Sequence, residues 1–238
     1  MSIFKDKTLV LNSNYKGLGN FVLSMPKLFA NNEGVVIKKG RNEIRILVHD
    51  GVEYVVKAFH RPNIINSLVY GRLRSSKAQR SYEYAEMLMK DGIGTPAPVA
   101  YYTERKGLFF TNSYYVSLKS ECSYTYADLL KGGFPDMEEI LRAIARTTAA
   151  IHNHGYIHKD YSRGNILFGR TDKGIKVEII DLNRIRFHKI KIEEGCKNFE
   201  RLPGTKEMLS IMADEYAKAR HFSPEECLGY IINCEHEV

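Results

Sequence analysis

The chain has 238 residues, of which 44% are hydrophobic and 26% charged, and its formal net charge is +7. This composition is typical of a globular protein with a sizeable core, and it excludes intrinsic disorder. No apolar run approaches the roughly 20 residues of a membrane-spanning helix, and the first residues lack the apolar segment of a signal peptide. The four cysteines include no Cys-x-x-Cys pair, so we expect reduced thiols and a cytoplasmic protein.

The first half of the chain has the pattern of β-structure. Five runs of alternating, often β-branched residues predict strands: residues 33–41, 42–50, 52–59, 97–105 and 107–118. The Asp50-Gly51 step between the second and third runs is a hairpin signal. Helical spacing covers residues 75–91, and Gly92 is a stop signal. We therefore predict an N-terminal lobe, residues 1–117, with a five-stranded antiparallel sheet and one main helix.

The second half, residues 118–238, is predicted to be mainly helical. Asp136 as N-cap begins a helix with an apolar face, and Gly155 can end it. Ser223, followed by proline, begins another helix near the C-terminus. Between these helices, three short strand-like runs are expected: residues 156–160, 165–169 and 175–182.

Residues suited to phosphate chemistry lie between these short strands. His158, Asp160 and Asn165 form an H-x-D-x4-N motif, and Asp181 ends an apolar strand sixteen residues beyond Asn165. An aspartate at the end of a strand can orient the proton of an attacking hydroxyl, while asparagine and aspartate supply the oxygen ligands that Mg²⁺ prefers. The pattern predicts phosphoryl transfer, with Asp160 as the catalytic residue and Asn165 and Asp181 as metal ligands.

The segments HKDYSRGNIL and IIDLNR, which contain these residues, resemble sequences of the protein-kinase-like superfamily. They resemble in particular the lipopolysaccharide core kinases, which phosphorylate Kdo or heptose sugars. The resemblance implies a bilobal, compact α+β fold forming one kinase-like domain, with ATP and Mg²⁺ as cofactors and Asp160 as the catalytic base. It also implies that Lys57, in the run YVVKAF, holds the α- and β-phosphates. The partner of Lys57 would be Glu83, with Glu86 as the alternative.

The chain departs from eukaryotic protein kinases in ways that favour a small acceptor. No G-x-G-x-x-G motif precedes Lys57, so a hairpin at residues 38–43 would have to cover the phosphates with backbone groups. Ser162 stands where protein kinases usually carry lysine, and Asp181 is not followed by Phe-Gly. Only 57 residues follow Asp181, which leaves little room for a peptide-docking lobe.

We therefore expect an ATP-dependent phosphotransferase that phosphorylates Kdo or heptose in the lipopolysaccharide inner core. Two alternatives remain open: a RIO-like atypical protein kinase that uses the same residues, and a pseudokinase or ATP-binding scaffold, which the missing glycine-rich loop supports. The expected partner is a lipid A-core glycolipid or a related sugar acceptor. No nucleic acid is expected to bind, and a monomer is expected.

One basic segment is not part of the predicted active site. Residues 60–80 mix apolar side chains with arginine and lysine and contain no acidic residue. Our hypothesis is that they contact an anionic surface, either the inner membrane or the lipid A part of the acceptor. The alternative is that their apolar side chains pack on the small lobe.

Overall fold

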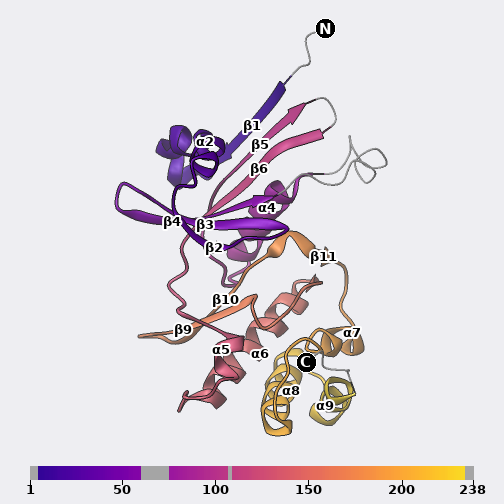
Figure 1. The fold of residues 1–238 in the computed structure, drawn as a ribbon. Coiled ribbons are helices and arrows are strands. Elements are labelled where there is room, and N and C mark those ends of the chain that lie inside the picture. The colour runs from indigo at the N-terminus through magenta and orange to yellow at the C-terminus, as the bar shows by residue number, and fades with distance from the viewer. Residues whose placement is uncertain (1–4, 60–74, 107–108, 234–238) are drawn as a thin grey trace. The chain divides into compact units, whose positions relative to one another are not determined.

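The computed structural model describes residues 5–59, 75–106 and 109–233, which are coloured in Figure 1. They form two compact units: residues 1–86 with 96–119, and residues 87–95 with 120–238. The assignment of residues 1–117 to a nucleotide-binding lobe and 118–238 to a catalytic lobe stays a prediction. The hypothesis on the basic segment 60–80 concerns mainly residues 60–74, which lie outside the described residues.

The first unit is built on a six-stranded antiparallel sheet with the strand order β1-β5-β6-β4-β3-β2. Its strands are β1 Lys5–Leu11, β2 Val35–Lys38, β3 Asn42–His49, β4 Val52–Phe59, β5 Pro98–Lys106 and β6 Phe109–Leu118. The five predicted strands are confirmed, but the count of five was wrong because β1 adds a sixth. Four of the seven residues of β1 are polar, and the strand joins the sheet edge through backbone pairing with β5, which an alternation pattern does not reveal.

The hairpin between β3 and β4 turns where the sequence predicted. His49 pairs with Val52, so Asp50 and Gly51 form a two-residue loop. Both have positive φ, 50° and 78°, as a primed hairpin turn requires. This turn fixes the register that places every later side chain of β4 on its face of the sheet.

Helices cover the sheet of the first unit. They are the 3-10 helix η1 Ser13–Leu18, α1 Gly19–Leu23, α2 Met25–Ala30 and α4 Lys77–Lys90. The main helix α4 is confirmed, whereas η1, α1 and α2 were not predicted. Each of these three is too short to display two full turns of apolar periodicity.

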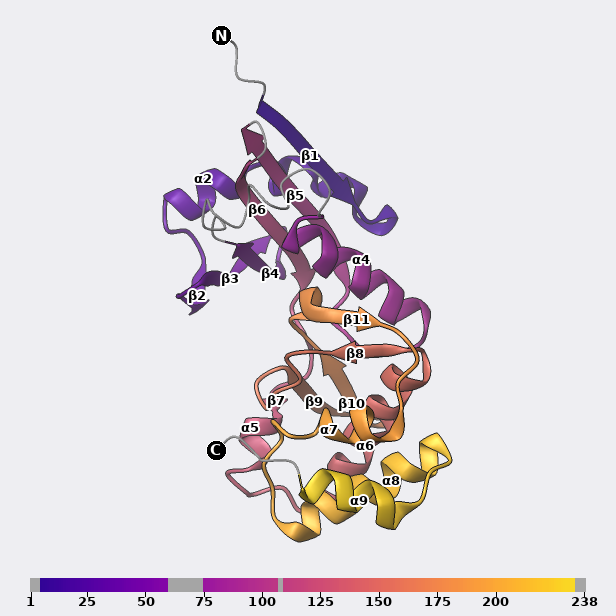
Figure 2. The same ribbon diagram turned by 90° about the vertical axis from the view of Figure 1, so that its right-hand side faces the viewer.

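The two faces of the sheet carry different helices. Tyr101 and Tyr102 are neighbours in β5, so their side chains point to opposite faces. Tyr102 belongs to a buried cluster with Phe21 of α1 and Met25 of α2. Tyr101 belongs to another cluster with Tyr82 of α4. The short helices therefore cover one face and α4 covers the other (Figure 2).

The second unit combines small sheets with helices. Its strands form the sheets β10-β9-β7 and β11-β8, with β7 Tyr124–Thr125, β8 Tyr156–His158, β9 Ile166–Thr171, β10 Gly174–Ile179 and β11 Ile185–Phe187. Its helices are α5 Tyr126–Leu129, α6 Met137–Asn153, the 3-10 helix η2 Leu182–Arg184, α7 Ile192–Lys197, α8 Lys206–Arg220 and α9 Pro224–Ile232. The α+β fold class, with a mainly helical C-terminal part, is confirmed.

The predicted helix starts are correct, with one difference in mechanism. The Ser223 hydroxyl accepts a hydrogen bond from the Glu226 N–H at 3.2 Å and caps α9. Asp136 stands at the N-cap of α6, but its side chain makes no cap bond and instead binds Arg170. An ion pair with a charged partner has replaced the usual capping interaction.

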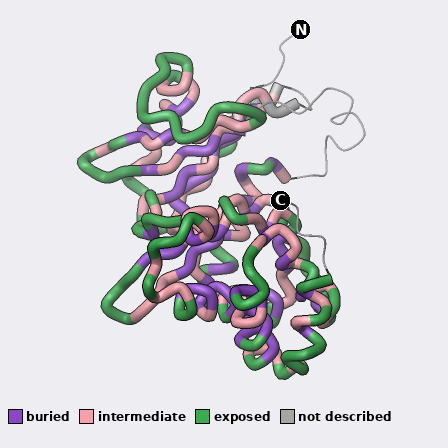
Figure 3. The backbone as a smooth tube through the Cα atoms, turned by 60° about the horizontal axis from the view of Figure 1, so that its bottom comes forward, coloured by how far each residue is buried: buried purple, intermediate pink, exposed green. Residues whose placement is uncertain are grey.

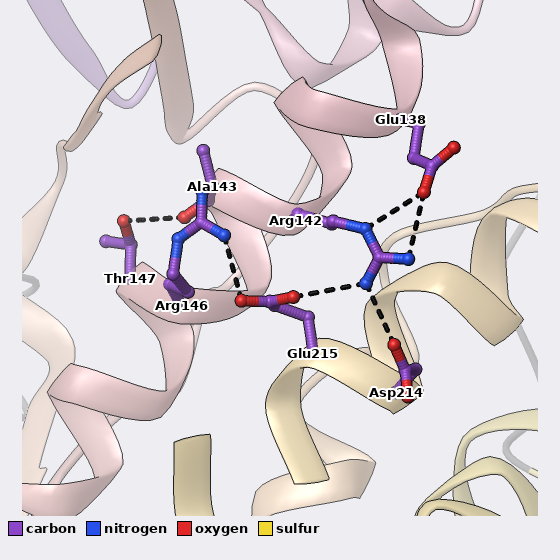
Figure 4. A network of polar contacts seen from close by, with 7 residues as sticks. All are labelled: Glu138, Arg142, Ala143, Arg146, Thr147, Asp214 and Glu215. Atoms are coloured by element: carbon purple, nitrogen blue, oxygen red, sulfur yellow. Dashed lines mark hydrogen bonds and ion pairs between the residues drawn. The ribbon is translucent and has the colours of Figure 1, made fainter. Parts of the chain in front are cut away.

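Helix α6 is the centre of the second unit. Most of its buried side chains are aliphatic. Figure 3 shows buried and exposed stretches alternating along the chain. Charged side chains also join α6 to α8: Arg142 and Arg146 each bind a carboxylate oxygen of Glu215, at 3.1 and 2.8 Å (Figure 4). Across residues 5–59, 75–106 and 109–233, no helix combines the length and apolar character needed to cross a bilayer.

Candidate active site

The H-x-D-x4-N motif forms a closed, hydrogen-bonded loop between β8 and β9. The Asn165 side-chain amide donates to the Asp160 carbonyl at 2.8 Å, and the Asn165 N–H donates to the Ser162 carbonyl at 2.8 Å. The Asp160 N–H donates to Nδ1 of His158 at 3.1 Å. The spacing of five residues therefore returns Asn165 to the side of Asp160.

His158 supports this loop from within the core. Its side chain is fully buried, and its Nε2 lies 3.1 Å from the Ile180 carbonyl. A neutral ring with its proton on Nε2 satisfies both this contact and the bond from Asp160, and burial lowers the pKa of His158 accordingly. Asn198 donates to the His158 carbonyl at 3.0 Å. These contacts give His158 a structural role in the loop.

Asn165 and Asp181 are brought together by the pairing of β9 with β10. Ile166 pairs with Ile179, and the Ile180 N–H donates to the Asn165 carbonyl at 3.0 Å. The chain then turns at Asp181, whose φ of 61° and ψ of 45° are left-handed. Because Asn165 precedes one strand and Asp181 follows the other, both lie at the same end of this antiparallel pair.

The oxygen donors at this end suit a hard cation. The Asn165 amide nitrogen is held on the Asp160 carbonyl, so the amide oxygen is oriented away from it, while Asp181 contributes a carboxylate whose Oδ1 accepts from Asn183 at 2.5 Å. Among the described residues, no three His, Cys, Asp or Glu side chains converge as a metal site. Mg²⁺ is usually held by one or two protein oxygens together with water and substrate phosphates, so this donor set fits Mg²⁺ bound to a nucleotide.

Two arginines at the Asp160 carboxylate were missed by the sequence analysis. Arg201 Nη1 donates to Oδ1 of Asp160, and Arg184 Nη1 lies 3.6 Å from Oδ2. Arg184 lies three residues after Asp181 and outside the H-x-D-x4-N motif. Arg201 lies 41 residues from Asp160 in a segment without a motif, so no signal in the sequence pointed to it.

Lys57 occupies a buried position in the first unit. It lies in β4, its side chain is 8% exposed, and its Nζ lies 5.3 Å from the ring centroid of Phe59. Phe59 is two residues further along the strand and packs with Tyr82 of α4. Alternation therefore places Lys57 on the sheet face that α4 covers, where a charged helix partner is expected.

The two candidate partners on α4 have different surroundings. Glu83 is half-buried and accepts a hydrogen bond from Gln79 at 2.8 Å, and together with burial its charge raises the pKa of Tyr101. Glu86 is exposed and accepts from Asn12 at 2.7 Å. Burial favours Glu83, and the choice stays a prediction.

The hairpin predicted to cover the phosphates joins β2 and β3, with residues 39–41 at its tip. Gly40 lies at this tip, and a Cβ added there would meet nothing within 4 Å. Gly34, at the base, has a φ of 83°, and its Cβ would lie 2.5 Å from the Ile46 carbonyl oxygen. Gly34 is thus needed by the sheet, whereas Gly40 leaves the tip backbone open to a ligand.

A model of the lipopolysaccharide kinase (Kdo/WaaP) family matches residues 29–219. The chain belongs to this family. A search of curated proteins gave no significant match. Among solved structures, this family member resembles WaaP in complex with acyl carrier protein, with a TM-score of 0.62, 17% identity, and coverage of 94% of this chain and 96% of that chain. WbdD bound to a kinase inhibitor gives a TM-score of 0.45 at 14% identity, covering 82% of this chain and 43% of that chain.

These comparisons confirm the predicted family and the protein-kinase-like fold. The chain is thus a phosphotransferase of the lipopolysaccharide kinase family. The predicted roles of Lys57, Glu83, Asp160, Asn165 and Asp181 stay predictions, to which the structure adds the contacts described above.

Proposed function

We propose that the chain transfers the γ-phosphate of ATP to a hydroxyl of Kdo or heptose in the lipopolysaccharide inner core. The observation that carries this proposal is the closed loop that holds Asp160 beside Asn165, at the end of the β9–β10 pair where Asp181 follows. A base and two oxygen ligands in this order are what in-line transfer to an alcohol requires.

The residues of the chain act mainly by positioning. Asp160 accepts a hydrogen bond from the acceptor hydroxyl and takes its proton as the oxygen attacks. Asn165 and Asp181 would hold the metal, and Lys57 would bind the α- and β-phosphates. When bound, Mg²⁺-ATP supplies the phosphoryl group and the metal neutralises its developing charge. Holding the two substrates together removes most of the entropic barrier to their reaction.

The test is transfer of γ-labelled phosphate from ATP to purified glycolipids. Lipid A carrying only Kdo and lipid A carrying Kdo and heptose are incubated separately with the enzyme, with a bacterial protein extract as a third acceptor. Label on a glycolipid supports the proposal, and the glycolipid that is labelled names the sugar. Label on protein alone would contradict it and favour the RIO-like alternative.

We propose that the enzyme works as a monomer at the cytoplasmic face of the inner membrane. The support is chemical: its acceptor is anchored in lipid, and the net charge of +7 favours an anionic surface. Sedimentation with vesicles of anionic and of zwitterionic lipid tests this. Equal recovery in the supernatant with both vesicle types would contradict peripheral membrane binding.

We also propose an acyl carrier protein as a partner, since WaaP was solved with one. The second unit contains a cavity of about 540 Å³ whose lining is largely apolar: Leu129, Leu130, Met137, Leu141, Met208 and Ile211. Such a cavity suits an acyl chain. Binding of acylated carrier protein that is lost with the unacylated form, and weakened by Ile211→Glu, is the expected result. Equal binding of both forms would contradict a role for the cavity.

A further inference from the structure

Both carboxylate oxygens of Asp160 face an arginine. Arg201 Nη1 makes a charged hydrogen bond to Oδ1, and Arg184 Nη1 lies 3.6 Å from Oδ2. Arg184 ends η2, just after Asp181, whereas Arg201 follows α7. Two separate segments of the second unit thus converge on the proposed catalytic carboxylate.

This arrangement differs from the one in which Asp160 can act on a hydroxyl. The hydroxyl must donate to a carboxylate oxygen at about 2.6–3.2 Å, and a charged bond from Arg201 already engages Oδ1. A carboxylate accepts more than one hydrogen bond, so Arg201 either shares Asp160 with the hydroxyl or exchanges it for a group of the acceptor. An exchange of partners at Arg201 needs a second group that can replace the carboxylate.

The two arginines are able to bind such a group. A guanidinium binds carboxylates through N–H donors arranged in a planar fork, and Arg201 already does so through Nη1 with Asp160. The Arg184 side chain is 52% exposed, and its contact with Asp160 is longer than a direct hydrogen bond. The group that best replaces a carboxylate on a guanidinium is another carboxylate, because the planar fork matches its geometry.

We propose that Arg184 and Arg201 bind a carboxylate of the acceptor, on or next to the sugar that is phosphorylated, and that this exchange releases Asp160 for the acceptor hydroxyl. This inference rests on the proposed function and assigns the acceptor side of the same site. It makes the preferred acceptor a sugar acid or a sugar attached to one. A neutral sugar would leave Arg201 on Asp160 and would be a poor substrate.

The contact with Asp160 assigns the arginines to the acceptor rather than to the nucleotide. Asp160 acts on the acceptor hydroxyl, so groups within bonding distance of its carboxylate lie where the acceptor binds. In the proposed function the nucleotide phosphates have other partners, namely Lys57 and a metal that Asn165 and Asp181 would hold. The test must therefore exclude the alternative that Arg184 and Arg201 bind the transferred phosphate.

Other arginine pairs of the second unit have a different character. Arg170 binds Asp136 through two nitrogens at the N-cap of α6, and Arg142 joins α6 to α8. These carboxylates belong to no catalytic motif. Arg170→Gln is therefore a matched control, since it removes the same type of ion pair from the same unit.

The test compares two acceptors, a glycolipid with free Kdo carboxylates and its methyl ester, at saturating ATP. With the wild type, esterification is expected to raise the acceptor KM by about 10-fold to 100-fold, the effect of losing a charged hydrogen bond. Arg201→Gln should raise KM by a similar factor for the acid and add little for the ester. Arg184→Gln should act in the same direction but less, because its contact is longer.

The controls and the contrary outcome are defined by the same measurement. Arg170→Gln should leave the acceptor KM unchanged for both glycolipids, and Arg201→Lys should recover part of the preference for the acid. An equal rise for acid and ester in Arg201→Gln, or a rise in the KM for ATP instead, would overturn the proposal. The first result would give Arg201 a structural role, and the second would assign it to phosphate binding.

Direct binding separates this inference from the proposed function. If the wild type phosphorylates neither glycolipid, the proposed function fails, and NMR of ¹⁵N-labelled arginine side chains still tests the exchange. The Nε signals of Arg184 and Arg201, assigned with the two glutamine variants, should shift on addition of free Kdo and not of its methyl ester. Unchanged signals with free Kdo would overturn the inference.

Discussion

The predicted functional residues of the two units are held in place in different ways. In the second unit, Asp160, Asn165 and His158 are held by hydrogen bonds between particular side chains and backbone groups at a fixed spacing. In the first unit, Lys57 lies in a regular strand, and its place follows from register and alternation. A bonded loop demands particular residue types, whereas a strand position accepts many. The loop can therefore be recognised in the sequence by a strong motif, whereas the strand lysine has almost no motif of its own.

If this difference reflects function, the loop should be the most sensitive part of the enzyme. Asp160→Asn and Asp181→Asn are each expected to lower kcat by about 10³-fold or more, because one would remove the predicted base and the other a predicted metal ligand. Circular dichroism should show an unchanged fold. Asp172→Asn, in the exposed turn between β9 and β10, is the control and should keep full turnover. Turnover like that of the wild type in either active-site variant would contradict the assignment.

The strand position should be sensitive as well, although less so. Lys57→Met is expected to lower kcat/KM for ATP by about 10²-fold, the usual effect of losing one charged donor in a site. Lys119→Met, which removes the partner of Glu53 in the same unit, should change it less than about twofold. Similar effects of the two variants would mean that Lys57 is only a buried structural lysine.

Helix α4 offers a finer comparison between two glutamates one turn apart. Glu83→Gln is expected to lower kcat by about 10-fold, because we predict that this half-buried side chain is the partner of Lys57. Glu86→Gln, at an exposed position bonded to Asn12, should have little effect. The opposite order in steady-state kinetics would transfer the role to Glu86.

The smallest expected effect concerns stability, through the buried hydrogen bonds near the predicted catalytic loop. His152 is almost fully buried, contacts Asn198 and Tyr216, and has its pKa lowered by burial to about 4. Its unfolded pKa is about 6.5, so the unfolded chain binds more protons below that pH and stability falls as pH decreases. Between pH 7 and pH 5.5 the free energy of unfolding should drop by about 1 kcal/mol from this residue.

Urea denaturation at both pH values and NMR titration of the histidines check this prediction. His158, whose pKa burial also lowers, adds to the slope in the same direction. A stability independent of pH over this range, or a His152 ring that is charged at pH 5.5, would contradict the account of the buried network.

The same difference between loop and strand explains how far the sequence could predict the structure. The hairpin at Asp50-Gly51 and the helix start at Ser223 depend on neighbouring residues, and both were correct. Strand β1 was missed because an edge strand is defined by its partner, here β5. The cap at Asp136 was placed correctly, but its side chain binds Arg170 from a distant strand.

For the candidate site, too, the sequence did not predict contacts between residues that lie far apart in the chain. Asp160, Asn165 and Asp181 could be proposed from the sequence because one loop and one strand pair contain them all. Arg201 was not found, because only the folded chain brings it across 41 residues to Asp160. The choice between Glu83 and Glu86 depends likewise on burial, which one turn of a helix does not encode.

The most direct test of the central claim is mass spectrometry of the lipopolysaccharide core from cells with and without the gene. Deletion is expected to remove the mass of one phosphoryl group from one inner-core sugar, and the wild-type gene should restore it while the Asp160→Asn variant does not. A core of unchanged mass after deletion, or one restored by the Asp160→Asn variant, would contradict the assignment of this chain as a lipopolysaccharide sugar kinase that uses Asp160.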